Sequence, residues 1–104
     1  MNNVNLTGRI ASIVSSEKCT IFTVAAKRHR STDYTDFVDC IAFNSTSDFI
    51  QRNFEIGKPI EIEGYISKSK HNDEYHTRVI VESAGFCGAK IPQSTDEVSA
   101  QPED

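Results

Sequence analysis

The chain has 104 residues, of which 38% are hydrophobic and 25% are charged, and its formal net charge is −4. A chain of this length is expected to form one small domain with a single core, and no apolar run approaches the roughly 18 residues that a membrane-spanning helix needs. The sequence therefore argues against a membrane role. Because the N-terminus lacks the basic and apolar regions of a secretory signal, we expect a cytoplasmic protein.

The negative charge is concentrated at the C-terminus. Residues 91–104 contain four acidic residues and neither Lys nor Arg, whereas residues 1–90 contain 11 acidic residues against 11 Lys and Arg. The terminal segment is polar and holds two prolines, a composition that does not support a packed core. We therefore expect a neutral domain over residues 1–90 and an acidic, disordered tail over residues 91–104.

The residue types of metal and catalytic sites lack the spacings that such sites require. Cys19, Cys40 and Cys87 are widely separated, which argues against a disulfide framework and against paired zinc ligands. His71 and His76 fit no common zinc module with them. The chain also has no Gly-rich phosphate loop and no nucleophile elbow. We expect no metal, no cofactor and no enzymatic activity.

Alternating polar and apolar residues predict three strands in the first half of the chain. The first covers residues 3–14, with a bulge or bend at Gly8. The second covers residues 19–27, and a polar loop leads to the third, DFVDCIAF, over residues 36–43. The residues expected to face the core in the first two strands are Val4, Leu6, Ile10, Phe22, Val24 and Ala26.

The second half predicts one helix and two strands. Ser and Thr cap candidates begin the helical segment NSTSDFIQRNFEIG, residues 44–57, and Gly57 is expected to stop the helix. A fourth strand over residues 58–70 is expected to bend at Gly64, and a fifth covers residues 75–86. On the fourth strand, one face is expected to carry Ile60, Ile62 and Ile66.

Five strands with one short helix between the third and fourth are the order of the OB-fold. This is an all-β fold, a five-stranded Greek-key barrel that often binds oligonucleotides. A five-strand meander on another barrel suits the same pattern. Because a fold does not by itself assign a function, the binding residues must be identified separately.

Cations and flat rings are what single-stranded nucleic acid needs, for its phosphates and its bases respectively. Two basic runs, KRHR at residues 27–30 and KSKH at residues 68–71, end the second and fourth strands. Either run alone also suits a solvated loop. The residues that we expect to bind nucleic acid are Arg9, Lys27, Arg28, Arg30, Phe37, Phe43, Lys68, Lys70, His71, Tyr75 and Arg78.

The third strand is apolar on both faces. We expect its core face to consist of Val38, Cys40 and Ala42. The other face carries Phe37 and Phe43 with Asp39 between them, and either a nucleic acid or an oligomer interface would use these rings. One antiparallel register sets Lys27 opposite Phe37 and so diagonal to Asp39. On that hypothesis, Asp39 orients a base beside the stacking ring.

Four segments of the chain resemble the bacterial single-stranded DNA-binding proteins in order and spacing. They are VNLTGRI, FTVAAKR, TDFVDCIAF, and PIEIEGYISKSK followed by YHTRVIVE, and the similarity covers about residues 3–88. The resemblance implies an OB-fold that binds single-stranded DNA in replication, recombination and repair. It further implies a homotetramer, with a dimer as the alternative. The resemblance places stacking positions at Arg30, Phe37 and His71, with Phe43 at a fourth aromatic position.

The chain departs from that family in three respects. It has no tryptophan, which is the usual residue at the first three stacking positions. It also has Asp39 at a position where relatives can have a basic residue that faces phosphate. Replication or repair proteins are expected as possible partners, but the tail lacks the terminal Pro-Phe that recruits such proteins in the family, which argues against recruitment through it. Two other hypotheses are a primosomal replication-restart OB-fold factor and an oligomeric protein-interaction domain. For a single-stranded DNA-binding protein, we expect a location in the cytoplasm with the nucleoid.

Overall fold

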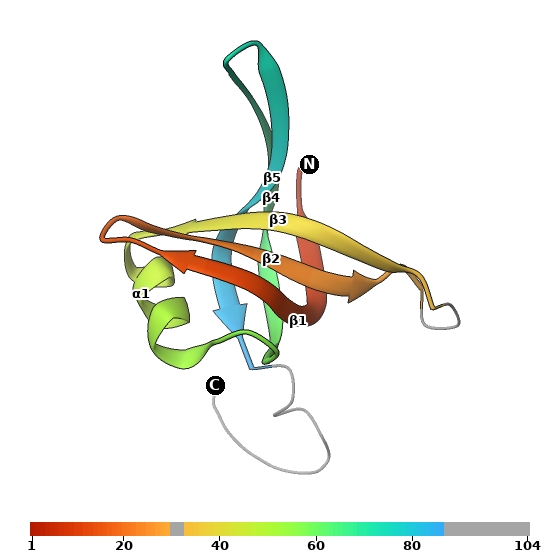
Figure 1. Ribbon diagram of the computed structural model, residues 1–104, viewed down its shortest axis with the longest axis vertical. Helices are drawn as coiled ribbons and strands as arrows, with labels where there is room; N and C mark the ends of the chain where they lie inside the picture. Colours follow the sequence, from red (N-terminus) through yellow and green to blue (C-terminus); the bar gives the residue numbers. More distant parts are fainter. Residues whose placement is uncertain (30–32, 87–104) are drawn as a thin grey trace.

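A computed structural model describes residues 1–29 and 33–86. The expectations for Arg30, for Cys87 and for the tail lie outside these residues. The strands pair into one closed barrel in the order β1-β2-β3-β5-β4 (Figure 1), and the single helix lies between β3 and β4, as the sequence predicts. The elements are β1 (Val4–Ser15), β2 (Cys19–Lys27), β3 (Thr35–Phe43), α1 (Asn44–Asn53), β4 (Pro59–His71) and β5 (Glu74–Gly85).

Strand β1 is shared between two neighbours. Its first half pairs with β4 and its second half pairs with β2. Of the bulge or bend expected at Gly8, the bulge is wrong, because the register with β4 continues through this residue and the irregularity lies between Ile10 and Ser12. Gly8 is instead a point of close approach, where a Cβ atom would meet the carbonyl oxygen of Ala25.

Two hairpins extend beyond the barrel as arms (Figure 1). Strands β3 and β5 run parallel and pair only at Cys40 with Val79 and at Ile41 with Ile80. Before these pairs the two strands separate, and each continues only within its own hairpin. We call residues 25–29 and 33–37 the β2–β3 arm, and residues 66–79 the β4–β5 arm.

The turn of the β4–β5 arm is tight. Asn72 and Asp73 both have positive φ angles, 51° and 65°, and the strands pair up to His71 and Glu74 on either side. Two successive positive φ angles are typical of a type I′ turn, whose twist matches that of the flanking strands. The arm is therefore a regular hairpin to its tip.

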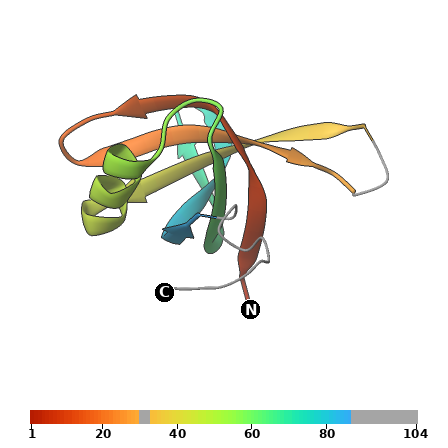
Figure 2. The ribbon, with the colours of Figure 1, turned by 90° about the horizontal axis from the view of Figure 1, so that it is seen from below.

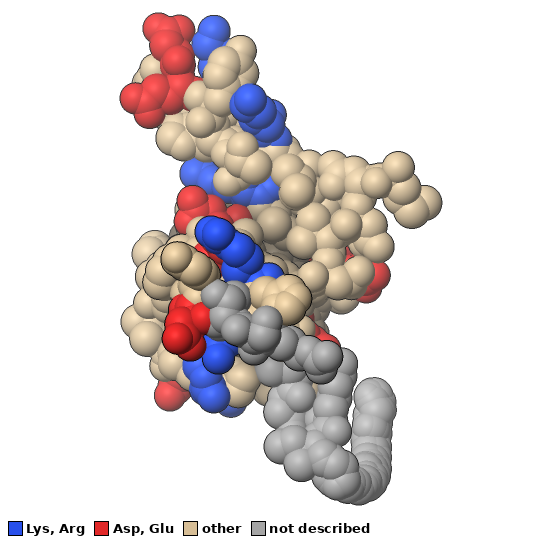
Figure 3. Space-filling model, turned by 90° about the vertical axis from the view of Figure 1, so that its right-hand side faces the viewer, with Lys and Arg blue, Asp and Glu red and all other residues tan. Residues whose placement is uncertain are grey.

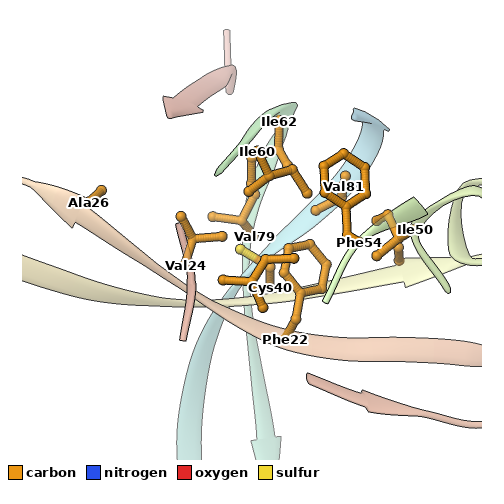
Figure 4. Close-up of a cluster of buried hydrophobic side chains, with 12 residues drawn as sticks. Phe22, Val24, Ala26, Cys40, Ile50, Phe54, Ile60, Ile62, Val79 and Val81 are labelled. Atoms are coloured by element: carbon orange, nitrogen blue, oxygen red, sulfur yellow. The ribbon is translucent and has the colours of Figure 1, made fainter. Parts of the chain in front are cut away.

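Inward-facing side chains of all five strands meet helix α1 in one core (Figure 4). The core faces predicted for the second and third strands are confirmed, with Val38 half-buried and the others buried. The shared face predicted for Ile60, Ile62 and Ile66 is observed, but only the first two are buried, and Ile66 is 49% exposed. The register shifts between Glu63 and Gly64, and Ile66 lies opposite Val79, where the hairpin leaves the barrel. The buried apolar residues are Ile10, Phe22, Val24, Ala26, Cys40, Ala42, Ile50, Phe54, Ile60, Ile62, Val79 and Val81.

Helix α1 lies at the end of the barrel opposite the β2–β3 arm (Figure 2). No Ser or Thr caps it, since Phe43 occupies the N-cap position without a side-chain hydrogen bond. A buried polar contact connects the helix to β2 instead, with 2.7 Å between the hydroxyl oxygens of Thr20 and Ser47. Gln51 Nε2 donates a further hydrogen bond to Thr20 Oγ1 at 2.9 Å. Satisfied buried groups of this kind fix the position of the helix on the barrel.

The helix ends before the glycine that was expected to stop it. Its last residue is Asn53, and the Phe54 N–H donates to the Ile50 carbonyl oxygen at 2.9 Å. Gly57, with φ of 92°, lies in the following turn and donates its N–H to the Ile10 carbonyl oxygen at 2.7 Å. Gly57 therefore belongs to the turn that connects the helix to β4, not to the end of the helix.

We expect Gly64→Ala to lower the free energy of unfolding by about 2–3 kcal/mol, in the range typical of overpacking. The added Cβ would meet the carbonyl oxygen of Ile80, which belongs to the backbone of β5 and cannot move alone. Gly85→Ala is the matched control, since its Cβ would lie 3.8 Å from the Glu61 side chain, an ordinary contact. Urea denaturation followed by circular dichroism measures both changes. Equal losses in the two variants would contradict this explanation.

Candidate nucleic-acid interface

The outer face of β3 exposes both of its phenylalanines. Alternation along the strand turns Cys40 and Ala42 into the core, whereas Phe37 is 66% and Phe43 is 44% exposed. This confirms the predicted division of DFVDCIAF into a core face and an open face. Six residues of strand separate the rings by roughly 20 Å, so one base cannot contact both.

An apolar row crosses the outer face between the two rings. It takes one residue from each strand, and each residue is the registered partner of the next. The residue at its centre, on β3, is only 7% exposed, whereas the two ends of the row are more open. The sequence does not predict this row, because the register between strands is not visible in a single chain segment. Its members are Val14, Ile21, Ile41, Ile80 and Tyr65.

Asp39 lies between Phe37 and the apolar row. Its cross-strand partner is Thr23, whose hydroxyl oxygen Oγ1 lies 3.3 Å from Asp39 Oδ1 and donates to it. The predicted register is wrong, because Ala25 rather than Lys27 lies opposite Phe37. Lys27 lies two residues farther along β2 and is therefore not diagonal to Asp39.

Two predicted cations, Lys27 and Arg9, are carried by β2 and β1 near Phe37. Lys27 is exposed at the end of β2 and, by alternation, lies on the same face as the ring. Arg9 pairs with Ala25, which pairs with Phe37, so the three residues form a row across three strands. Its Nη1 donates to the Gly57 carbonyl oxygen at 3.0 Å, on the far side of β1 from the ring. Of the two, Lys27 is the better placed for a phosphate beside Phe37.

Arg28 is engaged within the β2–β3 arm. Its Nε and Nη2 donate to the two carboxylate oxygens of Asp36 at 3.3 and 3.1 Å, and its guanidinium carbon lies 5.3 Å from the centroid of the Tyr34 ring. The hydrogen bond from Arg28 lowers the pKa of the Asp36 carboxyl below its usual value. Because residues alternate along β3, Asp36 lies on the opposite face from Phe37. Arg28, which is bound to Asp36, is therefore not positioned to contact a phosphate beside the Phe37 ring. Exposed Tyr34 is a ring that the predicted set omitted, although it directly precedes the third strand.

Lysines and a tyrosine gather on one face of the β4–β5 arm. The Nζ atoms of Lys68 and Lys70 lie 5.0 and 5.8 Å from the centroid of the Tyr75 ring, which is largely exposed. Lys70 also lies 3.9 Å from Asp73 Oδ1. We call Lys68, Lys70 and Tyr75 the Tyr75 cluster. It combines a stacking surface with cations, as a strand of single-stranded nucleic acid requires.

The other face of this arm carries Arg78 and His71. Arg78 directly precedes Val79, the partner of Cys40, and by alternation it shares the outer face with Ile80. It thus lies across the gap between β3 and β5 from Asp39, but the two do not form a salt bridge. His71 pairs with Glu74 at the tip, away from the barrel. The structure therefore distributes the predicted residues over two faces of the arm.

Charges of both signs line this side of the molecule. Figure 3 shows Lys and Arg groups from the β4–β5 arm down to the body, with Asp and Glu groups at the tip of the arm. A separate hollow over β1, β4 and β5 is lined by both polar and apolar residues, among them Glu61 and Glu63. Because two carboxylates repel phosphate, this hollow is the less suitable surface for nucleic acid.

The buried thiol under the interface is not a nucleophile. Burial, with a smaller effect of the Asp39 charge, raises the pKa of Cys40 to about 12, so the thiol stays neutral. Among residues 1–29 and 33–86, no group of His, Cys, Asp and Glu is arranged to hold a metal ion. No helix within the described ranges is long and apolar enough to cross a membrane.

Comparison with known proteins gives a family match over most of the chain. A model described as "Single-strand binding protein family" matches residues 1–87. The chain is 31% identical over 98 residues to a single-stranded DNA-binding protein of Clostridium perfringens, covering 83% of this chain and 65% of that protein. It is 28% identical over 116 residues to one of Fusobacterium nucleatum, covering 96% and 75%. The chain thus spans a little under two thirds of the length of the Clostridium relative.

Solved structures share the fold. A small single-stranded DNA-binding protein from Mycoplasma pneumoniae matches with a TM-score of 0.70 at 20% identity, covering 84% of this chain and 94% of that chain. The dimeric structure of the N-terminal domain of PriB protein from Thermoanaerobacter tencongensis matches with a TM-score of 0.63 at 21% identity, covering 81% and 93%. At these identities the likeness concerns the fold alone, and it confirms the predicted OB-fold.

Proposed function

The chain belongs to the single-strand binding protein family, a family of non-enzymatic DNA-binding proteins, and we propose that it binds single-stranded DNA. The observation that carries the proposal is the outer face of β3, where Phe37 and Phe43 are both exposed on either side of the apolar row. Large exposed apolar surfaces are typical of binding sites, because their burial releases water. This surface lies beside cations of both arms.

Both base stacking and phosphate contacts would contribute to the binding free energy. Bases stacked on Phe37 and Phe43 contribute about 1–3 kcal/mol each, and the contribution tolerates any sequence because every base has a flat face. Phosphates would contact Lys27 and Arg78 on the outer face. The Tyr75 cluster would hold a further segment of the strand. Arg28 contributes less, because Asp36 already accepts its hydrogen bonds.

A preference for single strands follows from the positions of the rings. A duplex keeps the faces of its bases inside the helical stack, so neither phenylalanine can stack on them without unpairing. The two rings are also roughly 20 Å apart on a straight strand. A flexible single strand can follow that path across the apolar row, whereas a rigid duplex cannot.

We further propose that the protein is a homo-oligomer, a tetramer as the family resemblance implies or else a dimer. Residues 4–7 of β1 pair with β4 alone, and in the described part of the chain no strand covers their other edge. An open edge of this kind is suited to pairing with the same segment of a second copy. On this proposal the protein acts in DNA replication, recombination and repair, in the cytoplasm with the nucleoid.

Two other functions stay open to the same fold. One is a replication-restart factor, which the likeness to the PriB domain does not favour because that likeness concerns the fold alone. An interaction domain would turn Phe37 and Phe43 toward a protein. The family match over residues 1–87 favours DNA binding over both.

We expect the protein to bind a labelled mixed-sequence single strand tightly at low salt and the matched duplex feebly. About four phosphate contacts, from Lys27, Lys68, Lys70 and Arg78, predict that affinity falls about 50-fold between about 50 and 200 mM NaCl. Fluorescence anisotropy measures both dependences. The absence of single-strand binding at low salt would refute the proposed function.

Phe37→Ala and Phe43→Ala should each weaken binding of the single strand by about 1–3 kcal/mol if the rings stack on bases. Ile56→Ala is the control, because this exposed apolar residue lies between α1 and β4 and belongs to neither arm. Anisotropy gives the affinities, and sedimentation of the same samples gives the number of subunits. A variant that dissociates the oligomer but still binds DNA would place its ring in a subunit interface.

A further inference from the structure

We propose that Asp39 makes one position of the interface prefer bases that carry an exocyclic amino group over thymine. This inference rests on the proposed function and specifies it further. It concerns cytosine, adenine and guanine, whose amino groups donate hydrogen bonds. Stacking on the phenylalanines would remain indifferent to sequence, so the preference is confined to the nucleotide beside Phe37.

The position of Asp39 suits contact with the edge of a stacked base. It is two residues from Phe37 on the same face of β3, a separation of roughly 7 Å along the strand. A base lying on the exposed ring extends its edge over neighbouring positions of the sheet. From Phe37 toward the barrel, the next residue on the same face of β3 is Asp39, and the one after it is the apolar Ile41. Asp39 is therefore the polar side chain of this face that the edge of the base can reach.

Thr23 holds the carboxylate in place. Its hydroxyl donates to Asp39 Oδ1 at 3.3 Å, and the two residues are registered partners across β2 and β3. Within the described residues, Oδ2 accepts no hydrogen bond from the protein. One oxygen is thus fixed by the fold, and the other remains an acceptor for a ligand.

A carboxylate oxygen accepts hydrogen bonds and donates none, which decides the choice of base. The amino groups of cytosine and adenine donate to such an oxygen, and guanine offers an amino group beside its ring N–H. Thymine has one ring N–H, but it lies between two carbonyl oxygens that would face the carboxylate. The same side chain therefore attracts three bases and disfavours the fourth.

No cation neutralises this carboxylate within the described structure. Arg78 lies across the gap between β3 and β5 without forming a salt bridge to Asp39, and Lys27 lies farther along the β2–β3 arm. A negative charge in the path of a polyanion repels phosphate unless it makes a compensating contact. A hydrogen bond to a base amino group is such a contact.

Two oligonucleotides of equal length, one of 5-methyldeoxycytidine and one of thymidine, test the inference. Their bases both carry the 5-methyl group and differ only at position 4 and in the ring N–H, so stacking and phosphate contacts are matched. For the protein without substitutions, we expect the 5-methylcytosine strand to bind about five- to tenfold more tightly than the thymidine strand. Fluorescence anisotropy at one salt concentration measures both affinities. A ratio near one would overturn the inference.

Variants of two acids on β3 separate base contact from charge. Asp39→Asn keeps the shape, removes the charge and supplies a donor for the thymine carbonyl, so the ratio should fall to about one or invert. Asp36→Asn removes one charge from the opposite face of the same strand and should leave the ratio unchanged. If Asp39→Asn tightens both strands equally, Asp39 only repels phosphate and the inference is wrong.

Failure of the inference and failure of the proposed function give different results. Equal binding of both oligonucleotides would leave single-stranded DNA binding intact and remove the base preference. No binding of either strand, or of a mixed-sequence strand at low salt, would refute both.

Discussion

The barrel closes through two residue pairs between β3 and β5, and the rest of the molecule depends on this short parallel contact. Cys40 and Val79 are buried beneath it, and Ile41 and Ile80 lie above it in the apolar row. Because the strands run parallel and separate before this point, both hairpins leave the barrel where these strands begin. A longer β3–β5 pairing would hold the two arms together. The short pairing leaves them apart, with the exposed ring of Phe37 and the guanidinium of Arg78 on either side of the gap.

Under the proposed function, core packing and DNA binding use opposite faces of β3. Cys40 and Ala42 fill the core, whereas Phe37 and Phe43 contribute large apolar surfaces to solvent and little to packing. Substitutions of these two phenylalanines are therefore expected to alter binding with small effects on folding. The fold itself depends on the core, on the buried Thr20–Ser47 contact and on the close approach at Gly64.

Local periodicity was enough to predict the order of the elements and most of the core faces. The alternation that buries Phe22 and Val24 and exposes Phe37 is a property of each strand alone, and it can be read without knowing its neighbours. Ile66 continues the alternation but is exposed, because β4 leaves the barrel beyond Gly64, and only the pairing with β5 shows where that occurs. The predicted Ser or Thr cap is wrong because the helix begins at Asn44, directly after β3, so that Phe43 occupies the N-cap position.

The candidate site was less predictable because it depends on register. Phe37, Phe43, Tyr75 and both basic segments were identified from residue types, whereas Tyr34 was not. The pairing of Asp39 with Thr23, and of Arg28 with Asp36, required the observed alignment of β2 and β3. A shift of two residues was enough to place Lys27 away from Asp39. Cross-strand register also creates the apolar row, which no single segment contains.

Backbone amide chemical shifts during titration with mixed-sequence single-stranded DNA test the central claim most directly, because they locate the contact on the molecule. We predict the largest changes along the outer face of β3 and on both arms, including Phe37, Phe43 and the Tyr75 cluster. Amides around the acidic hollow of β1 and β4, such as those of Asn5 and Glu61, should change little. Changes concentrated at that hollow, or no changes at the two phenylalanines, would contradict the assignment of the outer face as the DNA-binding surface.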